Sequence, residues 1–140
     1  MCIRDSKYDF LPYTEVENEC TIMPNGLEDL IDCWNNSPKL SNSGNPECLR
    51  YQPEILKALS AMGNAWFKFV IKNNEDWREI EQDFLNTGFI QRSQIVLMPE
   101  GASREDLERN REKVVEIAIR KNVRYSSREQ IELWDRKTGM

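Results

Sequence analysis

The sequence predicts an α/β fold with a mostly parallel sheet. Short apolar segments alternate along the chain with segments in which apolar residues recur at helical spacing. Parallel neighbours need a crossover of a dozen or more residues, and a helix between two strands supplies one. The 140 residues, 39% of them hydrophobic, also provide enough apolar material for one packed core.

Two strands, a turn and a loop are predicted in the first third of the chain. Residues 13–17, YTEVE, alternate as a strand does, and residues 30–34, LIDCW, form a short apolar run typical of a second strand. Between them, residues 24–26 (Pro-Asn-Gly) predict a turn. Residues 35–50 are rich in Asn, Ser, Gly and Pro, which predicts a loop, and loops of that length are often functional.

Three helices are predicted in the rest of the chain. The first begins at Pro53, which suits the first helical position, and ends near Gly63. The second follows Asn73, a favourable N-cap residue. The third and longest begins after Ser103, with Asp106 three residues later as a variant of the capping box. Its apolar face is expected to carry Leu107, Val114, Val115 and Ala118.

Three further strands are predicted between and after these helices. Residues 65–71, AWFKFVI, are apolar except for Lys68, which is typical of a strand buried on both faces of a sheet. Residues 94–99, QIVLMP, form another buried strand, and residues 131–134, IELW, are expected to be the terminal strand with Trp134 in the core. Strands and helices therefore alternate to the end of the chain.

Composition argues against several classes of function. The net charge is −5, and no basic stripe interrupts the balanced charges, which argues against nucleic acid as a direct partner. The chain has no His, so it cannot supply a Ser-His-Asp triad or a His-ligated zinc. No apolar run approaches the roughly 20 residues that cross a bilayer, and no leader is recognisable. We therefore expect a soluble, cytoplasmic protein without a membrane partner.

The four cysteines do not form a metal-binding pattern. Cys2, Cys20, Cys33 and Cys48 are separated by 18, 13 and 15 positions. Zinc and iron–sulfur sites normally begin with a pair of cysteines close together in sequence. We expect separate reduced thiols, with no metal ligand among them.

A parallel sheet binds ligands beyond the carboxyl ends of its strands. In this sequence, polar residues follow the predicted strands at that edge. Ser37, Pro38 and Lys39 offer a hydroxyl, a rigid turn and a cation, which suit a carboxylate or a ribose but also an ordinary loop. Glu100 directly follows a predicted strand and can accept hydrogen bonds from ribose hydroxyls or an amine. Thr21 can offer a hydroxyl at the same edge.

Taken together, four segments carry a family resemblance: 34–46, 67–71, 94–107 and 124–140. In order and spacing they resemble the C-terminal part of 7-carboxy-7-deazaguanine synthases, radical S-adenosylmethionine enzymes of queuosine and other deazapurine pathways, and hence of tRNA modification. SPKLSNSG and LMPEG are the most specific parts. The resemblance covers roughly residues 8–140, so residues 1–7 are expected to be a junction outside the family pattern.

The resemblance implies the C-terminal part of a radical-S-adenosylmethionine barrel, a partial (β/α) barrel. The family's lyase reaction contracts the ring of 6-carboxy-5,6,7,8-tetrahydropterin to 7-carboxy-7-deazaguanine with loss of ammonia. A [4Fe–4S] cluster cleaves S-adenosylmethionine, magnesium assists, and the enzyme is usually a homodimer. By resemblance, the residues that contact S-adenosylmethionine are Ser37, Pro38, Lys39, Leu97, Met98, Pro99 and Glu100, and we add Thr21 at the same edge.

The chain also departs from the family pattern. It has no CxxxCxxC motif for the cluster, no adjacent Thr or Ser for magnesium and no GGEP-like stretch, so we expect an N-terminally truncated chain that is inactive alone. Cys20 stands where the family usually has Gly, which crowds a tight turn if the backbone there has a positive φ. Ser127 and Gln130 stand where relatives often have Pro and His, and Gln130 is our candidate for substrate binding.

Two other interpretations also fit the sequence. A non-catalytic α/β module that binds a nucleoside or a pterin explains the missing cysteines without truncation. A different radical S-adenosylmethionine enzyme, such as an activating enzyme, shares the same chemistry but fits the SPKLSNSG and LMPEG pairing less well.

Overall fold

The structure is a computed structural model that describes residues 13–23, 26 and 28–136. The expected junction at residues 1–7 lies outside the described residues, as do Pro24 and Asn25 of the expected turn. Gly26, the third residue of that turn, has a φ of 72°. None of the helices in the described residues combines the length and hydrophobicity that crossing a membrane requires.

Five strands form one sheet, and every neighbouring pair in it is parallel. The order across the sheet is the order along the chain, so each strand pairs with the next. The α/β prediction with mostly parallel strands is therefore confirmed, and the arrangement is that of a partial (β/α) barrel. The strands are β1 (Glu15–Asn18), β2 (Cys33–Asn36), β3 (Ala65–Ile71), β4 (Ile95–Pro99) and β5 (Arg124–Tyr125).

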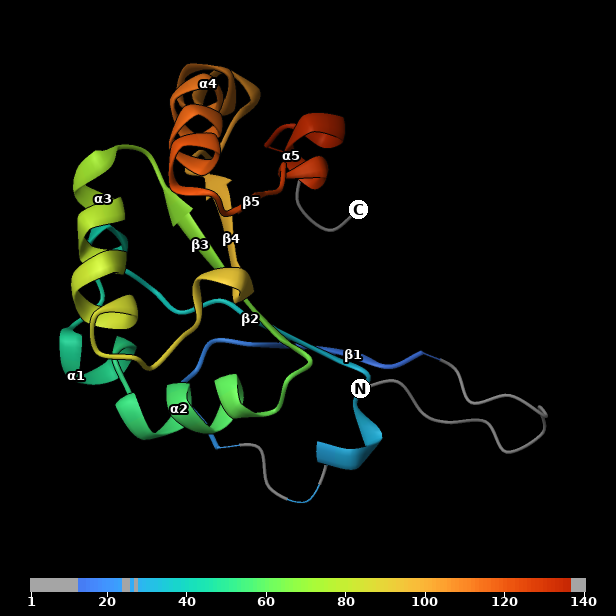
Figure 1. The fold of residues 1–140 in the computed structure, drawn as a ribbon. Coiled ribbons are helices and arrows are strands. Elements are labelled where there is room, and N and C mark those ends of the chain that lie inside the picture. The colour runs from blue at the N-terminus through green and yellow to red at the C-terminus, as the bar shows by residue number, and fades with distance from the viewer. Residues whose placement is uncertain (1–12, 24–25, 27, 137–140) are drawn as a thin grey trace, which may run out of the picture.

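The helices form an arc along one side of the strands, with α2, α3 and α4 as its main members (Figure 1). The α-helices are α1 (Glu47–Arg50), α2 (Pro53–Ala61), α3 (Asn74–Glu79), α4 (Arg104–Lys121) and α5 (Glu129–Trp134). A π-helical segment, η3 (Ile80–Leu85), continues α3, and short 3₁₀ turns are η1 (Glu28–Leu30), η2 (Ser41–Ser43) and η4 (Arg92–Gln94).

Side-chain oxygens cap the two helices for which the sequence predicted a cap. The backbone N–H of Asp76 donates to Oδ1 of Asn73 at 3.0 Å, which starts α3. The N–H of Asp106 donates to Oγ of Ser103 at 3.2 Å at the start of α4. Both predictions are confirmed, since each oxygen satisfies one of the N–H groups that a helix start leaves unpaired.

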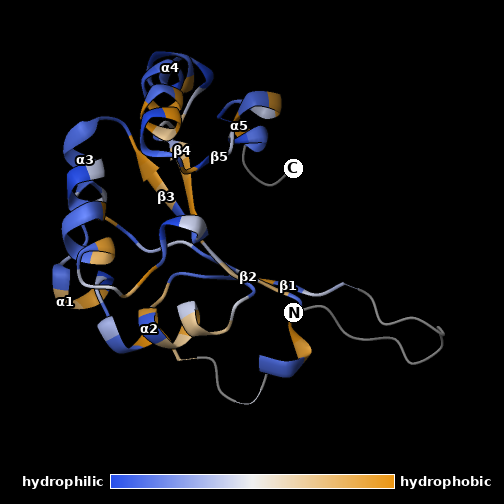
Figure 2. Ribbon diagram, viewed as in Figure 1, coloured by the Kyte–Doolittle hydropathy of each residue, from blue (hydrophilic) through white to orange (hydrophobic). Residues whose placement is uncertain are grey.

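The core lies between the sheet and this arc of helices. On β3, alternate residues Phe67, Phe69 and Ile71 are fully buried, and the rings of Phe69 and Phe84 meet edge to face at 4.9 Å. Figure 2 shows β3 and β4 largely in the orange of hydrophobic residues, whereas α3 is mainly blue and α4 mixes blue and orange turns. On α4 the buried residues include Ile117, whereas the predicted Val115 is only partly buried.

The opposite side of β3 and β4 is only partly covered. Its residues, Trp66, Lys68, Val70, Val96 and Met98, are all half-buried, and we call this surface the open face. The prediction that residues 65–71 are buried on both faces is therefore wrong. Among the described residues the helices pack on one side of these strands, so a lysine can occupy the middle of β3, where its Nζ lies 3.9 Å from the Glu17 carboxylate.

The predicted terminal strand at residues 131–134 is wrong, because these residues belong to helix α5. The next position on the sheet edge is already taken by β5, and the chain leaves β4 after the N–H of Ser126 donates to the Leu97 carbonyl. The N–H groups of Ile131 and Glu132 instead bond to the carbonyl of Arg128. Trp134 is 38% exposed, so it is not a core residue either.

Other boundaries also differ from the prediction, since β1 spans Glu15–Asn18 rather than residues 13–17. The second strand spans Cys33–Asn36 rather than residues 30–34, and Leu30 ends the short turn η1. Residues 35–50 are not a single loop, since they contain the end of β2, the turn η2 and the helix α1.

Candidate functional site

A cavity of about 340 Å³ lies at the carboxyl ends of the strands, which we call the carboxyl edge of the sheet. It takes residues from the segment after β2, from β3, and from the segments after β4 and β5. Its lining residues are Ser37, Pro38, Lys39, Leu40, Asn42, Ser43, Val70, Glu100 and Arg128. It thus brings together the predicted Ser37–Lys39 segment and Glu100, which are more than 60 positions apart in sequence.

The segment that carries Ser37, Pro38 and Lys39 is fastened at several points. The N–H of Ser37 donates to the Asn18 carbonyl at 2.7 Å, and the side-chain amide of Asn42 donates to the Val70 carbonyl at 3.1 Å. The Leu40 side chain is inserted into the core cluster, and Gly44 ends η2 with a φ of 76°. The polar groups of this segment are therefore held against the ends of β1 and β3.

Lys39 and Cys20 form the β1 side of the site. The Nζ of Lys39 lies 3.2 Å from the Glu19 carboxylate in a partly exposed ion pair. Cys20 is fully buried and has a φ of 62°, so the crowded turn that the sequence predicted is present. Burial raises the pKa of the Cys20 thiol to about 12, against a smaller opposing effect of the nearby Lys39 charge.

Glu100 is the one member of the Leu97–Glu100 segment whose side chain lines the cavity. Its N–H donates to the Ile71 carbonyl at 2.8 Å, and its own carbonyl accepts from the Asn110 side chain at 2.8 Å. Asn110 Nδ2 also lies 3.4 Å from a Glu100 carboxylate oxygen. Residues of β3 and α4 thus hold the Glu100 backbone in place, and Asn110 of α4 also reaches the exposed carboxylate.

The other members of that segment have different surroundings. The Leu97 side chain belongs to the core, and its carbonyl already accepts from Ser126. Pro99 is buried, and Met98 is half-buried on the open face, paired in register with Val70. Leu97, Met98 and Pro99 do not line this cavity, and their predicted roles in binding S-adenosylmethionine stay predictions.

Thr21 and Gln130 do not line the cavity. Thr21 is exposed on the turn that follows β1, and Gln130 is exposed on α5. Their predicted roles in binding cofactor and substrate stay predictions.

Sequence reasoning missed Arg128, which reaches the cavity from the segment between β5 and α5. Its Nη1 donates to the Gly101 carbonyl at 2.9 Å. The sequence did contain a signal for Arg128, since it lies in the last of the resembling segments and follows a strand at the carboxyl edge. Because β5 was not predicted, however, Arg128 could not be placed beside the sheet.

The cysteines in the described part of the chain do not fit a metal cluster. Cys20 and Cys33 are buried, Cys48 is exposed, and all three are free thiols. Within residues 13–23, 26 and 28–136, no group of three His, Cys, Asp or Glu side chains is placed to hold a metal ion. The described cysteines therefore do not form a set that could bind an iron–sulfur cluster.

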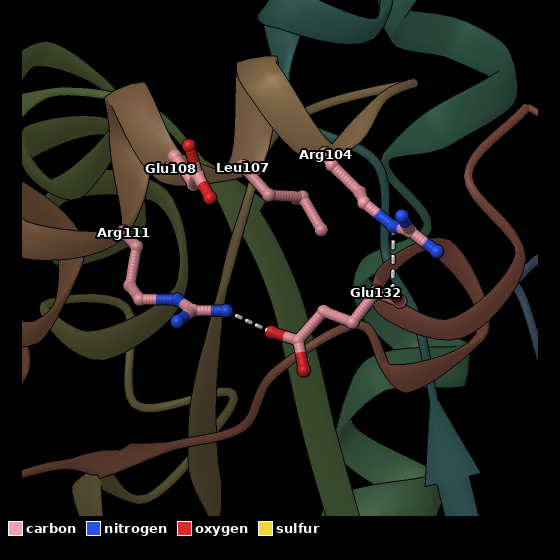
Figure 3. Close-up of a pocket in the computed structure, with 5 residues that line it drawn as sticks. All are labelled: Arg104, Leu107, Glu108, Arg111 and Glu132. Atoms are coloured by element: carbon pink, nitrogen blue, oxygen red, sulfur yellow. Dashed lines mark hydrogen bonds and ion pairs between the residues drawn. The ribbon is translucent and has the colours of Figure 1, made fainter.

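A second, smaller hollow of about 160 Å³ lies between α4 and α5 (Figure 3). Arg104 extends from α4 and its Nε donates to the Glu132 carbonyl at 2.8 Å, while the Arg111 guanidinium pairs with the Glu132 carboxylate. The polar groups of this hollow are thus used to fasten α5 to α4, and α5 begins next to Arg128.

The chemistry of the larger cavity suits a small molecule that carries both charges. Lys39 and Arg128 offer cationic donors, and Glu100 offers an anionic acceptor. The hydroxyls of Ser37 and Ser43 and the amide of Asn42 add neutral hydrogen-bonding groups, while Leu40 and Val70 supply apolar surface. A few polar groups converging on partly apolar walls are typical of a ligand site.

Comparison with known proteins gives one named similarity. Over 113 residues the chain is 30% identical to the 7-carboxy-7-deazaguanine synthase of Pyrobaculum aerophilum, and the match covers 81% of the chain and 48% of that protein. The chain therefore spans about half the length of this curated relative, and the two are distantly related. No protein-family model matches the chain, and no solved structure matches it significantly.

Proposed function

We propose that this chain forms the S-adenosylmethionine-binding part of a radical S-adenosylmethionine lyase of the 7-carboxy-7-deazaguanine synthase type. The observation that carries the proposal is the cavity itself, because it brings the Ser37–Lys39 segment and Glu100 to one place from two different connections of the sheet. These are the two segments that resemblance to the family assigned to S-adenosylmethionine. The similarity to the 7-carboxy-7-deazaguanine synthase of Pyrobaculum aerophilum supports the same proposal.

The groups of S-adenosylmethionine match the groups of the cavity. Its carboxylate suits the Lys39 ammonium, and its ammonium and ribose hydroxyls suit Glu100 as an acceptor. The Glu100 backbone is held by Ile71 and Asn110, which places its carboxylate at the cavity. The serine hydroxyls can bind the remaining polar edges.

The finer parts of the proposal concern the whole reaction. The substrate would be 6-carboxy-5,6,7,8-tetrahydropterin and the product 7-carboxy-7-deazaguanine, formed in the cytoplasm by a homodimer. The cluster and magnesium would be held by residues other than those described here, since no group of three His, Cys, Asp or Glu side chains among the described residues is placed to hold a metal ion. Met98 and Lys68 on the open face, beside the cavity residue Val70, would face the pterin.

Isothermal titration calorimetry with S-adenosylmethionine tests the binding step on the 140-residue chain. We expect saturable binding that Lys39→Ala weakens by at least tenfold, because a charge-assisted contact is lost. Lys57→Ala is the matched control, since Lys57 is an exposed lysine of α2 whose partner is Glu54. Equal affinity of the parent and Lys39→Ala would remove Lys39 from the site, and no binding by the parent would overturn the proposal.

A second assay tests the reaction. The N-terminal half of the Pyrobaculum synthase is joined ahead of Tyr13, and product from 6-carboxytetrahydropterin is measured by mass spectrometry under reducing conditions. We expect 7-carboxy-7-deazaguanine from a chimaera that binds S-adenosylmethionine. If the chimaera binds S-adenosylmethionine and its reconstituted cluster but forms no product, the chain is better described as a binding module.

A further inference from the structure

Arg128 is a cation of the cavity whose charge is unmatched by a described carboxylate. Lys39 is paired with Glu19, and Glu100 is oriented by Asn110. By contrast, the guanidinium of Arg128 makes one described hydrogen bond, from Nη1 to the Gly101 carbonyl, and among the described residues it has no ion-pair partner. Most of its five N–H donors therefore remain available for a ligand.

The position of Arg128 is set by its surroundings. Gly101, which accepts its hydrogen bond, has no space for a side chain, because a Cβ there would lie 2.9 Å from Cβ of Asp106 and 3.0 Å from the Leu107 nitrogen. The Gly101 backbone therefore packs closely against the first turn of α4. The Arg128 side chain, held by this carbonyl, lines the same cavity as Lys39 and Glu100.

We propose that Arg128 recognises a carboxylate of the ligand that occupies this cavity. This inference rests on the proposed function for the identity of the ligands. A guanidinium held at the cavity by one hydrogen bond still offers N–H groups whose fork matches the two oxygens of a carboxylate. Two ligands of the proposed reaction carry a carboxylate: S-adenosylmethionine at its amino-acid end, and the pterin at its 6-carboxyl group. Arg128 could bind either carboxylate in the same way.

The experiment compares each ligand with its analogue that lacks the carboxylate. Calorimetry on the 140-residue chain uses S-adenosylmethionine against decarboxylated S-adenosylmethionine, and 6-carboxypterin against pterin. For the ligand whose carboxylate Arg128 binds, we expect Arg128→Gln to lower the affinity by about 10- to 100-fold and to leave the affinity for the decarboxylated analogue unchanged. Arg128→Lys should restore part of the loss, because it keeps the charge but not the fork.

Arg109→Gln is the matched control, since Arg109 is an exposed arginine of α4 with partners Glu105 and Asp106. Urea unfolding of each variant shows that the fold is retained. If Arg128 had only a structural role, Arg128→Gln would lower the affinity for the carboxylate ligand and for its analogue equally. That result would overturn the inference.

The outcomes separate this inference from the proposed function. Binding of S-adenosylmethionine that depends on Lys39 but not on Arg128, with no Arg128 effect on either ligand, overturns the inference and leaves the proposed function intact. Binding of 6-carboxypterin that depends on Arg128, without binding of S-adenosylmethionine, supports the inference and overturns the proposed cofactor. A parent chain that binds none of the four compounds overturns both.

Discussion

The guanidinium of Arg50 lies 2.9 Å from the Glu79 carboxylate, and the two side chains are only 10% and 15% exposed. The same carboxylate accepts hydrogen bonds from the N–H and the hydroxyl of Ser41. Glu79 belongs to α3, Arg50 to α1 and Ser41 to η2. One side chain thus connects the segment that lines the cavity to two helices.

Replacing this carboxylate should affect both stability and the cavity. We expect Glu79→Gln to lower the free energy of unfolding by about 1–2 kcal/mol, because Arg50 keeps a poorly solvated charge without its partner. Affinity for S-adenosylmethionine should fall as well, since Ser41 loses an anchor next to Lys39. Urea unfolding and calorimetry measure the two effects.

Glu75→Gln on the same helix is the control. Its partner Arg78 lies 4.0 Å away and both side chains are more than two-thirds exposed, so the change should be within about 0.5 kcal/mol. Equal effects of the two substitutions would show that the Glu79 network does not hold the segment in place.

The left-handed backbone at Cys20 should reverse the usual order of alanine and glycine. With φ at 62°, any Cβ there is crowded, at a cost of roughly 1–2 kcal/mol that glycine avoids. Cys20→Gly should therefore be about 1 kcal/mol more stable towards urea than Cys20→Ala, although both lose the buried sulfur. If Cys20→Ala is the more stable variant, the turn does not keep its positive φ in solution.

The buried thiol of Cys20 should make stability depend on alkaline pH. The pKa of this thiol is about 12 in the folded chain against an ordinary value of 9.0, so above pH 9 the unfolded chain releases a proton that the folded chain keeps. The unfolded state then binds fewer protons, and stability falls as pH rises. We expect a loss of about 1.4 kcal/mol between pH 8 and 10 from this group.

The comparison with Cys20→Ala isolates this effect from other groups that titrate at high pH, such as Tyr51, whose pKa is also raised by burial. Urea unfolding of both chains at pH 8, 9 and 10 provides the measurement. Parallel pH profiles of the two chains would contradict the prediction.

Removing the Arg104 side chain should weaken the contact between α5 and α4, so that α5 unfolds locally more often. Arg104 donates to the carbonyls of Glu132 and Leu133, and its N–H donates to the Asp135 carboxylate (Figure 3 shows the Glu132 contact). Arg104→Ala keeps that backbone N–H but removes both side-chain bonds, so we expect faster hydrogen exchange in residues 129–134 with little change in global stability.

Arg120→Ala is the control for this exchange experiment, because Arg120 is exposed at the other end of α4 and pairs with Glu116. Protection of residues 129–134 should be the same in this variant and in the parent. Unchanged protection in Arg104→Ala as well would mean that other contacts, such as the Arg111–Glu132 pair, hold α5 alone.

Local patterns predicted the middle of the fold well. The strand at residues 65–71 has the predicted bounds, and both predicted caps, Asn73 and Ser103, accept the expected hydrogen bonds. These features depend on residues close together in sequence, whose propensities and spacing are sufficient to define them.

Features that depend on distant residues were predicted less well. The second strand includes Asn35 and Asn36, which are poor strand formers, yet Asn36 is fully buried and its amide donates to the Trp34 and Trp66 carbonyls. Residues 131–134 alternate like a strand, but the sheet edge beside β4 is already occupied by β5. At the cavity, Glu100 was named because it follows a predicted strand and Lys39 because it lies in a resembling segment, whereas Arg128 required knowledge of where β5 lies.

The order of the strands across the sheet also bears on how the chain folds during synthesis. Since each strand pairs with the one that precedes it, no strand has to wait for a partner made much later by the ribosome. Each new crossover can dock onto an edge that already exists, so the sheet can grow in the direction of translation. The cavity, which needs residues from after β2 to after β5, would be completed last, when Arg128 emerges.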